Sequence, residues 1–219
     1  MKYSIVIPAY NETSTISSLV SELASLYSFP IIVIDDGSDV LIKIENHHSN
    51  VHVIRNSSNK GKGYSILKGL RYSSELKCTH TITLDGDKQH NPANVKRFIN
   101  LDNDYDLVLG ARKLKSPMPL HRILSNKITS FIVSKISKIK VIDSQCGFRM
   151  YKNSIINRSS FREMGFQFES EVFFKINKQS IIKTVDIDVI YNDKKSHINN
   201  IVDTLRFVRL IIREIIYGK

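Results

Sequence analysis

The sequence contains no tryptophan and only two cysteines, Cys78 and Cys146, which do not form a C-x-x-C pair. A disulfide scaffold and a zinc site built on cysteines are therefore excluded, and we expect reduced thiols in a cytosolic protein. No stretch of about 20 uncharged apolar residues is present, and the apolar run Met1–Pro8 is short. We therefore expect neither a signal peptide nor a membrane-spanning segment.

Acidic side chains are also scarce, because 21 of them stand against 32 lysines and arginines, which gives a net charge of +11. Such an excess favours a polyanionic partner: a nucleic acid, an anionic membrane surface or a phosphate-rich substrate. The lack of clustered aromatic side chains for base stacking argues against a nucleic acid. The length of 219 residues and the apolar fraction of 42% suit one folded domain.

The first half of the chain alternates short apolar runs with segments of helical period. The expected strands are Tyr3–Ile7, Ile31–Ile34, Val51–Ile54, Thr79–Leu84 and Asp106–Leu109. Helices are expected after Thr13, over Gly63–Tyr72 and from Asn91-Pro92. This alternation predicts an α/β fold with a mostly parallel central sheet and helices on both faces. Ligands then bind at the carboxyl ends of the strands.

The second half is less regular. Helices are expected over Leu120–Val141, Phe168–Gln179 and from about Asn199 to Tyr217, with an edge strand at Phe148–Tyr151 and a strand at Ile181–Tyr191. We assign residues 1–198 to the catalytic unit and 199–219 to an amphipathic basic helix of the same domain. That last helix, like Leu120–Lys140, either packs on the domain or lies in a membrane interface beside a lipid.

Two carboxylates follow the fourth expected strand, at Asp85 and Asp87. Residues i and i+2 of an extended chain point to the same side, so both side chains can converge on one point, with Gly86 leaving room between them. Gln89 can add a neutral oxygen. Oxygen ligands suit Mg²⁺ or Mn²⁺, so this segment is either a metal site or a solvated acidic turn.

Two further strand ends carry polar clusters. Asp35 and Asp36 can hold a ribose or a base through charged hydrogen bonds, or can simply form a turn. The loop Asn59–Gly63 can place backbone N–H groups and Lys62 against a phosphate, although it matches neither a Walker loop nor G-x-G-x-x-G.

In order along the chain, the segments V-I-P-A-Y-N-E, I-D-D-G-S, N-K-G-K-G and D-G-D-K-Q-H resemble the inverting family 2 glycosyltransferases of the GT-A fold. L-G-A-R, H-R-I-L-S-N and D-S-Q-C-G-F-R-M-Y in the second half are similar to the dolichol-phosphate mannose synthase branch, and Phe166–Glu171 fits its relatives. The resemblance covers Tyr3 to about Asn199. It implies a three-layer α/β/α sandwich and an inverting, metal-dependent hexosyltransferase.

The resemblance also implies roles for individual residues. The nucleotide-sugar site would comprise Pro8, Ala9, Tyr10, Glu12, Asp35, Asp36, Lys62 and Asp85. The metal ligands would be Asp85, Asp87 and Gln89. The acceptor phosphate would meet Arg112, Arg122, Ser125 and Lys195, and Arg149 would either contact it as well or form a structural ion pair. The family also has a late basic motif, an arginine with Ser-Lys downstream of it. This sequence does not match that motif cleanly and has Lys194-Lys195-Ser196-His197 instead. Asp87, Arg112, Arg122 and Asp143 would carry the catalysis.

The acceptor decides whether a base is needed. A polyprenyl phosphate presents an oxygen that is already anionic, whereas a hydroxyl must lose a proton to a carboxylate. Asp143, Glu169 and Glu171 are the candidate bases, although Asp143 can instead orient the loop that follows it. The leading hypothesis is hexose transfer from a GDP- or UDP-sugar to a polyprenyl phosphate at the inner membrane face. The alternatives are a glycosyltransferase acting on a hydroxyl and a nucleotide-binding protein without catalysis.

Overall fold

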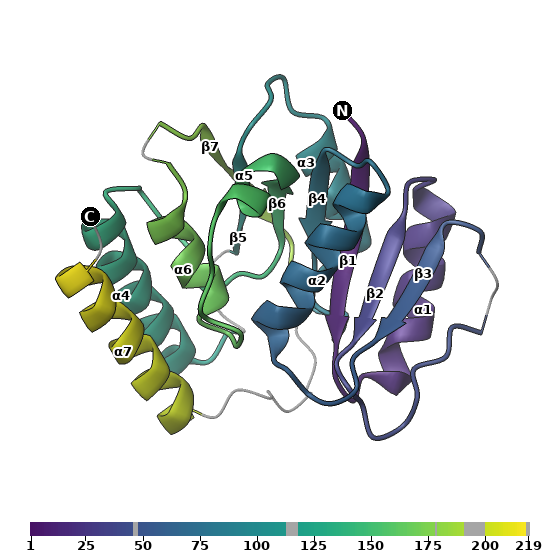
Figure 1. Cartoon of the computed structure of the whole chain (residues 1–219), viewed down its shortest axis with the longest axis horizontal. Coiled ribbons are helices and arrows are strands. Elements are labelled where there is room, and N and C mark those ends of the chain that lie inside the picture. Colours follow the sequence, from purple (N-terminus) through teal and green to yellow (C-terminus); the bar gives the residue numbers. More distant parts are fainter. Residues whose placement is uncertain (46–47, 113–117, 178, 191–199, 218–219) are drawn as a thin grey trace.

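The computed structural model describes residues 1–45, 48–112, 118–177, 179–190 and 200–217. A seven-stranded sheet in the order β3-β2-β1-β4-β6-β5-β7 runs through the molecule (Figure 1). The strands are β1 Tyr3–Ala9, β2 Ile31–Asp35, β3 Val51–Arg55, β4 His80–Thr83, β5 Leu107–Arg112, β6 Arg149–Lys152 and β7 Ile182–Ile187. The predicted α/β class with a mostly parallel sheet is confirmed.

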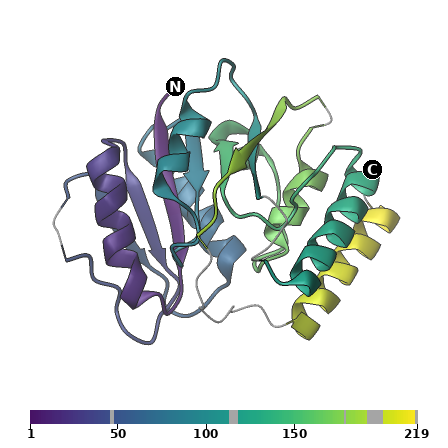
Figure 2. The same cartoon turned by 180° about the vertical axis from the view of Figure 1, so that it is seen from behind.

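Helices cover both faces of this sheet (Figures 1 and 2). They are α1 Thr13–Leu26, α2 Lys62–Glu75, a 3₁₀ turn η1 Pro92–Val95, α3 Lys96–Ile99, α4 Leu120–Ser137, α5 Asn153–Arg158, α6 Phe168–Lys175 and α7 Asn200–Tyr217. The segment after Asn91-Pro92 is thus a 3₁₀ turn and one turn of α-helix, α5 was not predicted, and α6 ends earlier than expected.

Two apolar cores lie on opposite faces of the sheet. Behind it, α1 buries Ile16, Leu19 and Leu23 against β1 and β2, as its helical period predicted. In front, α2, α5 and α6 pack around Phe168 and Phe173. Full burial of such side chains contributes about 1.5–3 kcal/mol each. These cores fix the strand ends that carry the polar motifs.

The prediction of an edge strand at Phe148–Tyr151 is wrong. Strand β6 lies inside the sheet and pairs antiparallel with β4 on one side and β5 on the other. Met150 and Tyr151 are each 1% exposed, which an edge position would not require. The edge on this side is β7, which pairs in parallel with β5 over Ile182–Ile187. The order of strands depends on contacts between distant segments, which local sequence patterns do not encode.

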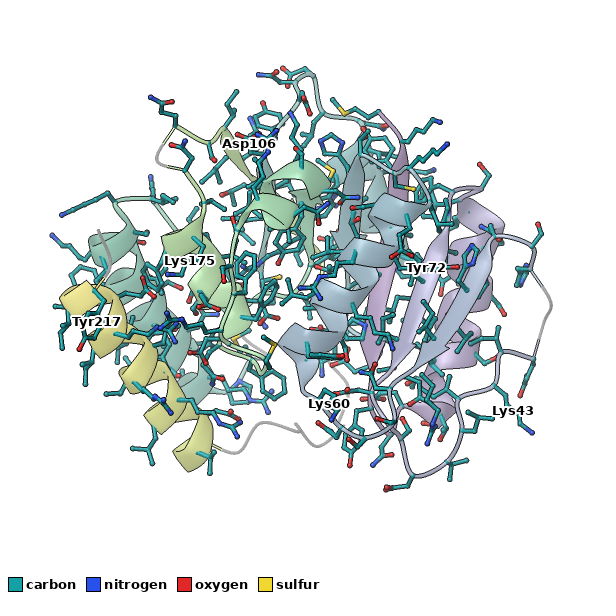
Figure 3. All side chains as sticks on the ribbon, in the orientation of Figure 1. Lys43, Lys60, Tyr72, Asp106, Lys175 and Tyr217 are labelled. Carbon is teal, nitrogen blue, oxygen red and sulfur yellow. The ribbon has the colours of Figure 1, made fainter. Side chains whose placement is uncertain are left out.

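Helices α4 and α7 lie side by side at one end of the molecule, and both views show them together (Figures 1 and 2). The inner side of α7 carries Leu210, which is buried, and the charged pair Arg213 and Glu214. Its outer side is apolar, and Tyr217 marks its end in Figure 3. No helix within the described ranges is long and apolar enough to cross a bilayer.

The large apolar side chains exposed on this helix pair define what we call the α4–α7 surface. It consists of Leu120, Leu124, Ile128, Phe131, Val202, Leu205, Val208, Ile212, Ile215, Ile216 and Tyr217, each at least 41% exposed. For α4, the apolar face expected from the sequence is thus largely outside, and the small residues Asn126, Ser130 and Val133 face inward. So many exposed large apolar side chains on two neighbouring helices of a globular protein indicate an interaction surface.

Candidate active site

A cleft of about 1080 Å³ lies at the carboxyl ends of β1, β2, β4 and β5. Most of the predicted site residues line it: Pro8, Ala9, Tyr10, Glu12, Asp36, Lys62, Asp85, Asp87, Gln89, Arg112, Arg122 and Ser125. Asp35, Asp143 and Arg149 do not, and Lys195 falls outside the described residues. The strands are parallel here, which is why motifs far apart in the sequence meet at one edge of the sheet.

Asp36 fixes the loop between β3 and α2. Its two carboxylate oxygens accept hydrogen bonds from the backbone N–H groups of Lys60 (2.9 Å) and Gly61 (2.8 Å). Gly61 has φ +101°, and a Cβ there would lie 2.4 Å from the carbonyl oxygen of Met164, so glycine is required. The loop, marked by Lys60 in Figure 3, delivers Lys62 as the first residue of α2. Helix N-termini attract anions such as phosphates.

Asp35 does not line the cleft, and its side chain stabilises the turn that follows β2. Its side chain is fully buried, lies 2.5 Å from Nη1 of Arg55, and accepts a hydrogen bond from the backbone N–H of Ser38. Burial alone would raise the pKa of Asp35, but the hydrogen bonds from Ser38 and Arg55 outweigh it and lower the pKa. The predicted contact between Asp35 and a nucleoside therefore disagrees with its position outside the cleft.

One lysine bridges two acidic side chains in the cleft. The Nζ atom of Lys62 lies 2.7 Å from Oδ1 of Asp85 and 2.8 Å from Oε1 of Glu169. Burial would raise the pKa of Asp85, but the ammonium of Lys62 outweighs it and holds this pKa at about 2. Gly147 packs against the pair, because a Cβ there would lie 2.8 Å from both Asp85 and Lys62. Asp85 is thus ionised at neutral pH.

Asp87 and Gln89 stand beside Asp85 on the same wall of the cleft. Burial and the nearby charge of Asp85 raise the pKa of Asp87, which is the signature of two carboxylates held close together. A divalent cation relieves such repulsion, and the oxygen-only set of Asp85, Asp87 and Gln89 suits Mg²⁺ or Mn²⁺. No group of three or more His, Cys, Asp or Glu side chains able to hold a metal occurs among the described residues. An ion held by this set would complete its coordination with water or with phosphate oxygens of a substrate.

Arg112 and Asp143 form a buried ion pair at the end of β5. Nε of Arg112 lies 2.7 Å from Oδ2 of Asp143 and Nη2 lies 2.9 Å from Oδ1, while Asn126 donates to the same carboxylate at 2.6 Å. Burial would raise the pKa of Asp143, but Arg112 lowers it. A carboxylate held in this way is a poor proton acceptor, so Asp143 positions Arg112 at the cleft.

Arg149 does not reach the cleft, which contradicts its predicted contact with an acceptor phosphate. It is fully buried, and its guanidinium donates to the backbone carbonyl oxygens of Ser144, Cys146 and Glu169 at 2.6–2.8 Å. It also lies over the ring of Phe173. Arg149 therefore ties the loop before β6 to the start of α6.

The three candidate bases differ sharply in position. Glu171 accepts hydrogen bonds from the backbone N–H groups of Arg162 and Glu163 and from Arg213 of α7, and it lies outside the cleft. Asp143 is held by Arg112, as described above. Glu169 is the candidate base that lines the cleft.

The far wall of the cleft is built from α4, α6 and α7. Arg122 and Ser125 of α4 are exposed there, next to apolar Leu124, Ile128, Val202 and Val208. The same apolar residues belong to the α4–α7 surface, so this surface continues into the cleft. Sequence reasoning missed Gln167 and Arg206 on this wall. Gln167 falls inside the quoted segment Phe166–Glu171, but nothing in the local sequence indicated that it lines the cleft.

Comparison with known proteins identifies a matching family and similar proteins of named activity. The model of the family described as "Glycosyl transferase family 2" matches residues 4–165. The UDP-N-acetylglucosamine–dolichyl-phosphate N-acetylglucosaminyltransferase of Methanococcus voltae is 30% identical, over 86% of this chain and 86% of the relative. The dolichol-phosphate mannosyltransferase of Pyrococcus furiosus is 25% identical, over 84% of this chain and 55% of the relative.

Among solved structures, one similar fold is that of glucosyl-3-phosphoglycerate synthase from Mycobacterium tuberculosis in complex with Mn²⁺, UDP and phosphoglyceric acid. The TM-score is 0.71 at 17% identity, and the match covers 98% of this chain and 77% of that one. At this identity the likeness concerns the fold.

Proposed function

The chain belongs to glycosyl transferase family 2, and from this we propose that it transfers a hexose from GDP-mannose or a UDP-hexose to a polyprenyl phosphate. The observation that carries the proposal is one cleft lined by two sets of groups. We call the carboxylates and the N-terminus of α2 its acidic end, and Arg112 and Arg122 with the apolar side chains of α4 its basic end. The relatives named for transfer to dolichyl or dolichol phosphate support this proposal.

The acidic end suits the donor. The nucleoside would lie against Tyr10, Glu12 and Asp36, and the diphosphate against Lys62 and the N-terminus of α2. Asp85, Asp87 and Gln89 would hold Mg²⁺ or Mn²⁺. When bound, such an ion stabilises the negative charge that develops on the leaving diphosphate.

The basic end suits a lipid phosphate. Arg112 is held rigidly by Asp143, and Arg122 is exposed on α4, so two guanidinium groups face the cleft from different elements. Guanidinium groups bind phosphate through paired hydrogen bonds. The apolar side chains next to them, Leu124 and Ile128, offer a surface for the isoprenoid chain.

The reaction then needs no proton acceptor. An anionic oxygen of the polyprenyl phosphate attacks the anomeric carbon while the bond from that carbon to the donor diphosphate breaks on the opposite side. The nucleoside diphosphate leaves with the bonding electron pair, and the configuration at the anomeric carbon inverts. Lys62, Arg112 and Arg122 stabilise the phosphates of donor and acceptor.

We further place the enzyme at the inner face of the cell membrane. The α4–α7 surface supports this location, because its apolar residues adjoin exposed basic side chains such as Lys127, Lys135 and Arg206. The cytoplasmic leaflet is anionic and attracts basic residues close to it. A lipid acceptor could then reach Arg122 without leaving the bilayer.

The proposal is tested by incubating the protein with GDP-mannose, UDP-glucose or UDP-N-acetylglucosamine, Mn²⁺ and a polyprenyl phosphate, and by extracting the lipid for mass spectrometry. We expect a lipid-linked hexose with at least one donor, loss of the product with EDTA, and loss of at least about 100-fold in rate for Asp87→Ala. The exposed Asp188→Ala serves as the control, because Asp188 does not line the cleft and pairs with Arg97. A fully active Asp87→Ala variant would refute the metal role.

The second candidate function, transfer to a hydroxyl, is favoured by one observation. Glu169 lines the cleft and could take a proton from such an acceptor. A rate that falls for Glu169→Gln on a hydroxyl acceptor, with no product on a polyprenyl phosphate, would favour it.

A further inference from the structure

Two hydrogen-bond acceptors in the cleft wall have no partner among the described residues. They are Oε1 of Gln167 and Oε2 of Glu169. Both residues are more than nine-tenths buried, at 5% and 3% exposed, and both line the cleft. Leaving a buried acceptor without a hydrogen bond is costly, so buried acceptors in folded proteins are as a rule satisfied by a donor.

The orientation of both side chains is fixed by the groups around them. Nε2 of Gln167 donates to the backbone carbonyl oxygen of Asp203 at 3.1 Å and to its carboxylate at 3.3 Å, so the opposite atom, Oε1, is the acceptor. A Cβ on Gly165 would lie 3.1 Å from this Oε1, so the glycine keeps the space beside it open. Glu169 is held through Oε1, which lies 2.8 Å from Lys62.

The place of these acceptors follows from the same contacts. Lys62 joins Glu169 to Asp85, which stands at the end of the cleft proposed for the diphosphate. Gln167 stands two residues before Glu169 and contacts α7, which forms the wall on the acceptor side. The group that lies between a donor diphosphate and an acceptor phosphate is the transferred sugar.

We propose that Gln167 and Glu169 form the subsite that recognises the transferred sugar, by accepting hydrogen bonds from its hydroxyl or amide N–H groups. The inference rests on the function proposed above and extends it to the choice of donor. A ligand rich in hydrogen-bond donors satisfies both oxygens, whereas a nucleoside diphosphate without a sugar leaves them unsatisfied. Sites built in this way discriminate strongly against analogues that lack the donor group.

The test compares the affinities of a nucleotide sugar and its nucleoside diphosphate by isothermal titration calorimetry with Mn²⁺. The nucleotide sugar is whichever of UDP-glucose, UDP-N-acetylglucosamine and GDP-mannose binds the unaltered protein most tightly. Glu169→Gln puts an NH₂ donor in place of Oε2, and Gln167→Met removes Oε1 at similar volume. Glu163→Gln, in the adjoining loop and outside the cleft, is the matched control.

We expect both variants to bind the nucleotide sugar at least about tenfold more weakly and Gln167→Met to bind the diphosphate within about twofold of the unaltered protein, while Glu163→Gln changes neither affinity. Gln167→Met does not disturb Lys62, so it separates sugar recognition from an effect on the diphosphate. If Gln167→Met leaves the affinity for the sugar unchanged, or weakens both ligands equally, the inference is overturned and the proposed function stands. If the unaltered protein binds neither ligand, the proposed function fails and the inference fails with it.

Discussion

The carboxylate of Asp143 is buried and accepts hydrogen bonds from Arg112 and Asn126. Taking such a charge out of water is costly, and its partners compensate only while both remain in place. Asp143 therefore acts through Arg112, whose guanidinium it holds at the cleft. Its contribution to stability depends on pH, because its pKa in the folded protein is lower than in the unfolded chain.

We predict that Asp143→Asn lowers the free energy of unfolding by about 3 kcal/mol at pH 7, because it leaves Arg112 buried without its counter-charge. The lowered pKa means that the stabilisation is fully present above the unfolded pKa of about 4 and is lost as the pH falls through the folded value. The difference between the variant and the unaltered protein should therefore shrink toward pH 3 in urea titrations. Asp188→Asn, which breaks the exposed pair with Arg97, should cost less than about 1 kcal/mol. A difference in the free energy of unfolding between Asp143→Asn and the unaltered protein that does not change with pH would contradict this account.

The positions of some site residues could be predicted from the sequence, and those of others could not. Asp85 and Asp87 were placed together because they follow one strand at a spacing of two, and they do lie on one wall. Asp35 and Asp36 are adjacent, and successive side chains of an extended chain point to opposite sides, so only one of them can face the cleft. The sequence does not say which one, and in the structure it is Asp36. The structural role of Arg149 was not predictable from local patterns, because the three carbonyl oxygens that bind it come from the loop before β6 and from the start of α6.

At the scale of elements, α7 turns Leu210, Arg213 and Glu214 inward and leaves most of its large apolar side chains exposed. Arg213 donates to Glu163 at 2.9 Å and to Glu171 at 2.8 Å, and Glu214 faces Lys175 of α6, labelled in Figure 3. Ion pairs thus hold the helix to α6, and its apolar residues remain available for another surface. The sequence predicted the helix and its basic stripe, but two amphipathic interpretations were open, because helical period alone does not say which side meets the domain.

We predict that the double variant Leu205→Ser with Ile212→Ser binds vesicles of anionic phospholipid at least about tenfold more weakly, since each buried Leu or Ile contributes about 1.5–3 kcal/mol. Both side chains are more than half exposed, so the stability of the fold should change little. The control is Val40→Ser with Leu41→Ser, two exposed apolar residues far from α7. Sedimentation with vesicles provides the measurement. Equal binding by the two double variants would remove the membrane role of the α4–α7 surface.

At the scale of the whole molecule, the parallel half of the sheet was predictable, and the second half was not. Strands β1, β2, β3 and β4 are parallel neighbours, and helices α1 and α2 make the crossovers from β1 to β2 and from β3 to β4. Local patterns therefore predict both the existence of these strands and the edge where their motifs meet. Strand β6 enters between β4 and β5 in the opposite direction, and the sheet is completed by β7 from near the end of the chain. Those pairings are non-local, and they place α4, α6 and α7 around the far wall of the cleft.

This arrangement joins the acidic and basic ends of one cleft in a family 2 glycosyltransferase whose net charge is +11. The excess of basic residues agrees with two proposed partners, a phosphate-bearing substrate and an anionic membrane surface. Arg112 and Arg122 are the part of that excess that would act on the acceptor itself.

The most direct measurement compares sugar transfer to a polyprenyl phosphate with transfer to the corresponding polyprenol, using the unaltered protein and Arg122→Gln. We predict product with the phosphate only, because no base is then needed, and a KM for the lipid at least about tenfold higher in Arg122→Gln with the donor KM unchanged. Lys43→Gln, an exposed cation at the opposite end of the molecule from α7 (Figure 3), is the control. Transfer to the polyprenol at a comparable rate, or an Arg122→Gln variant with the KM of the unaltered protein, would contradict the account.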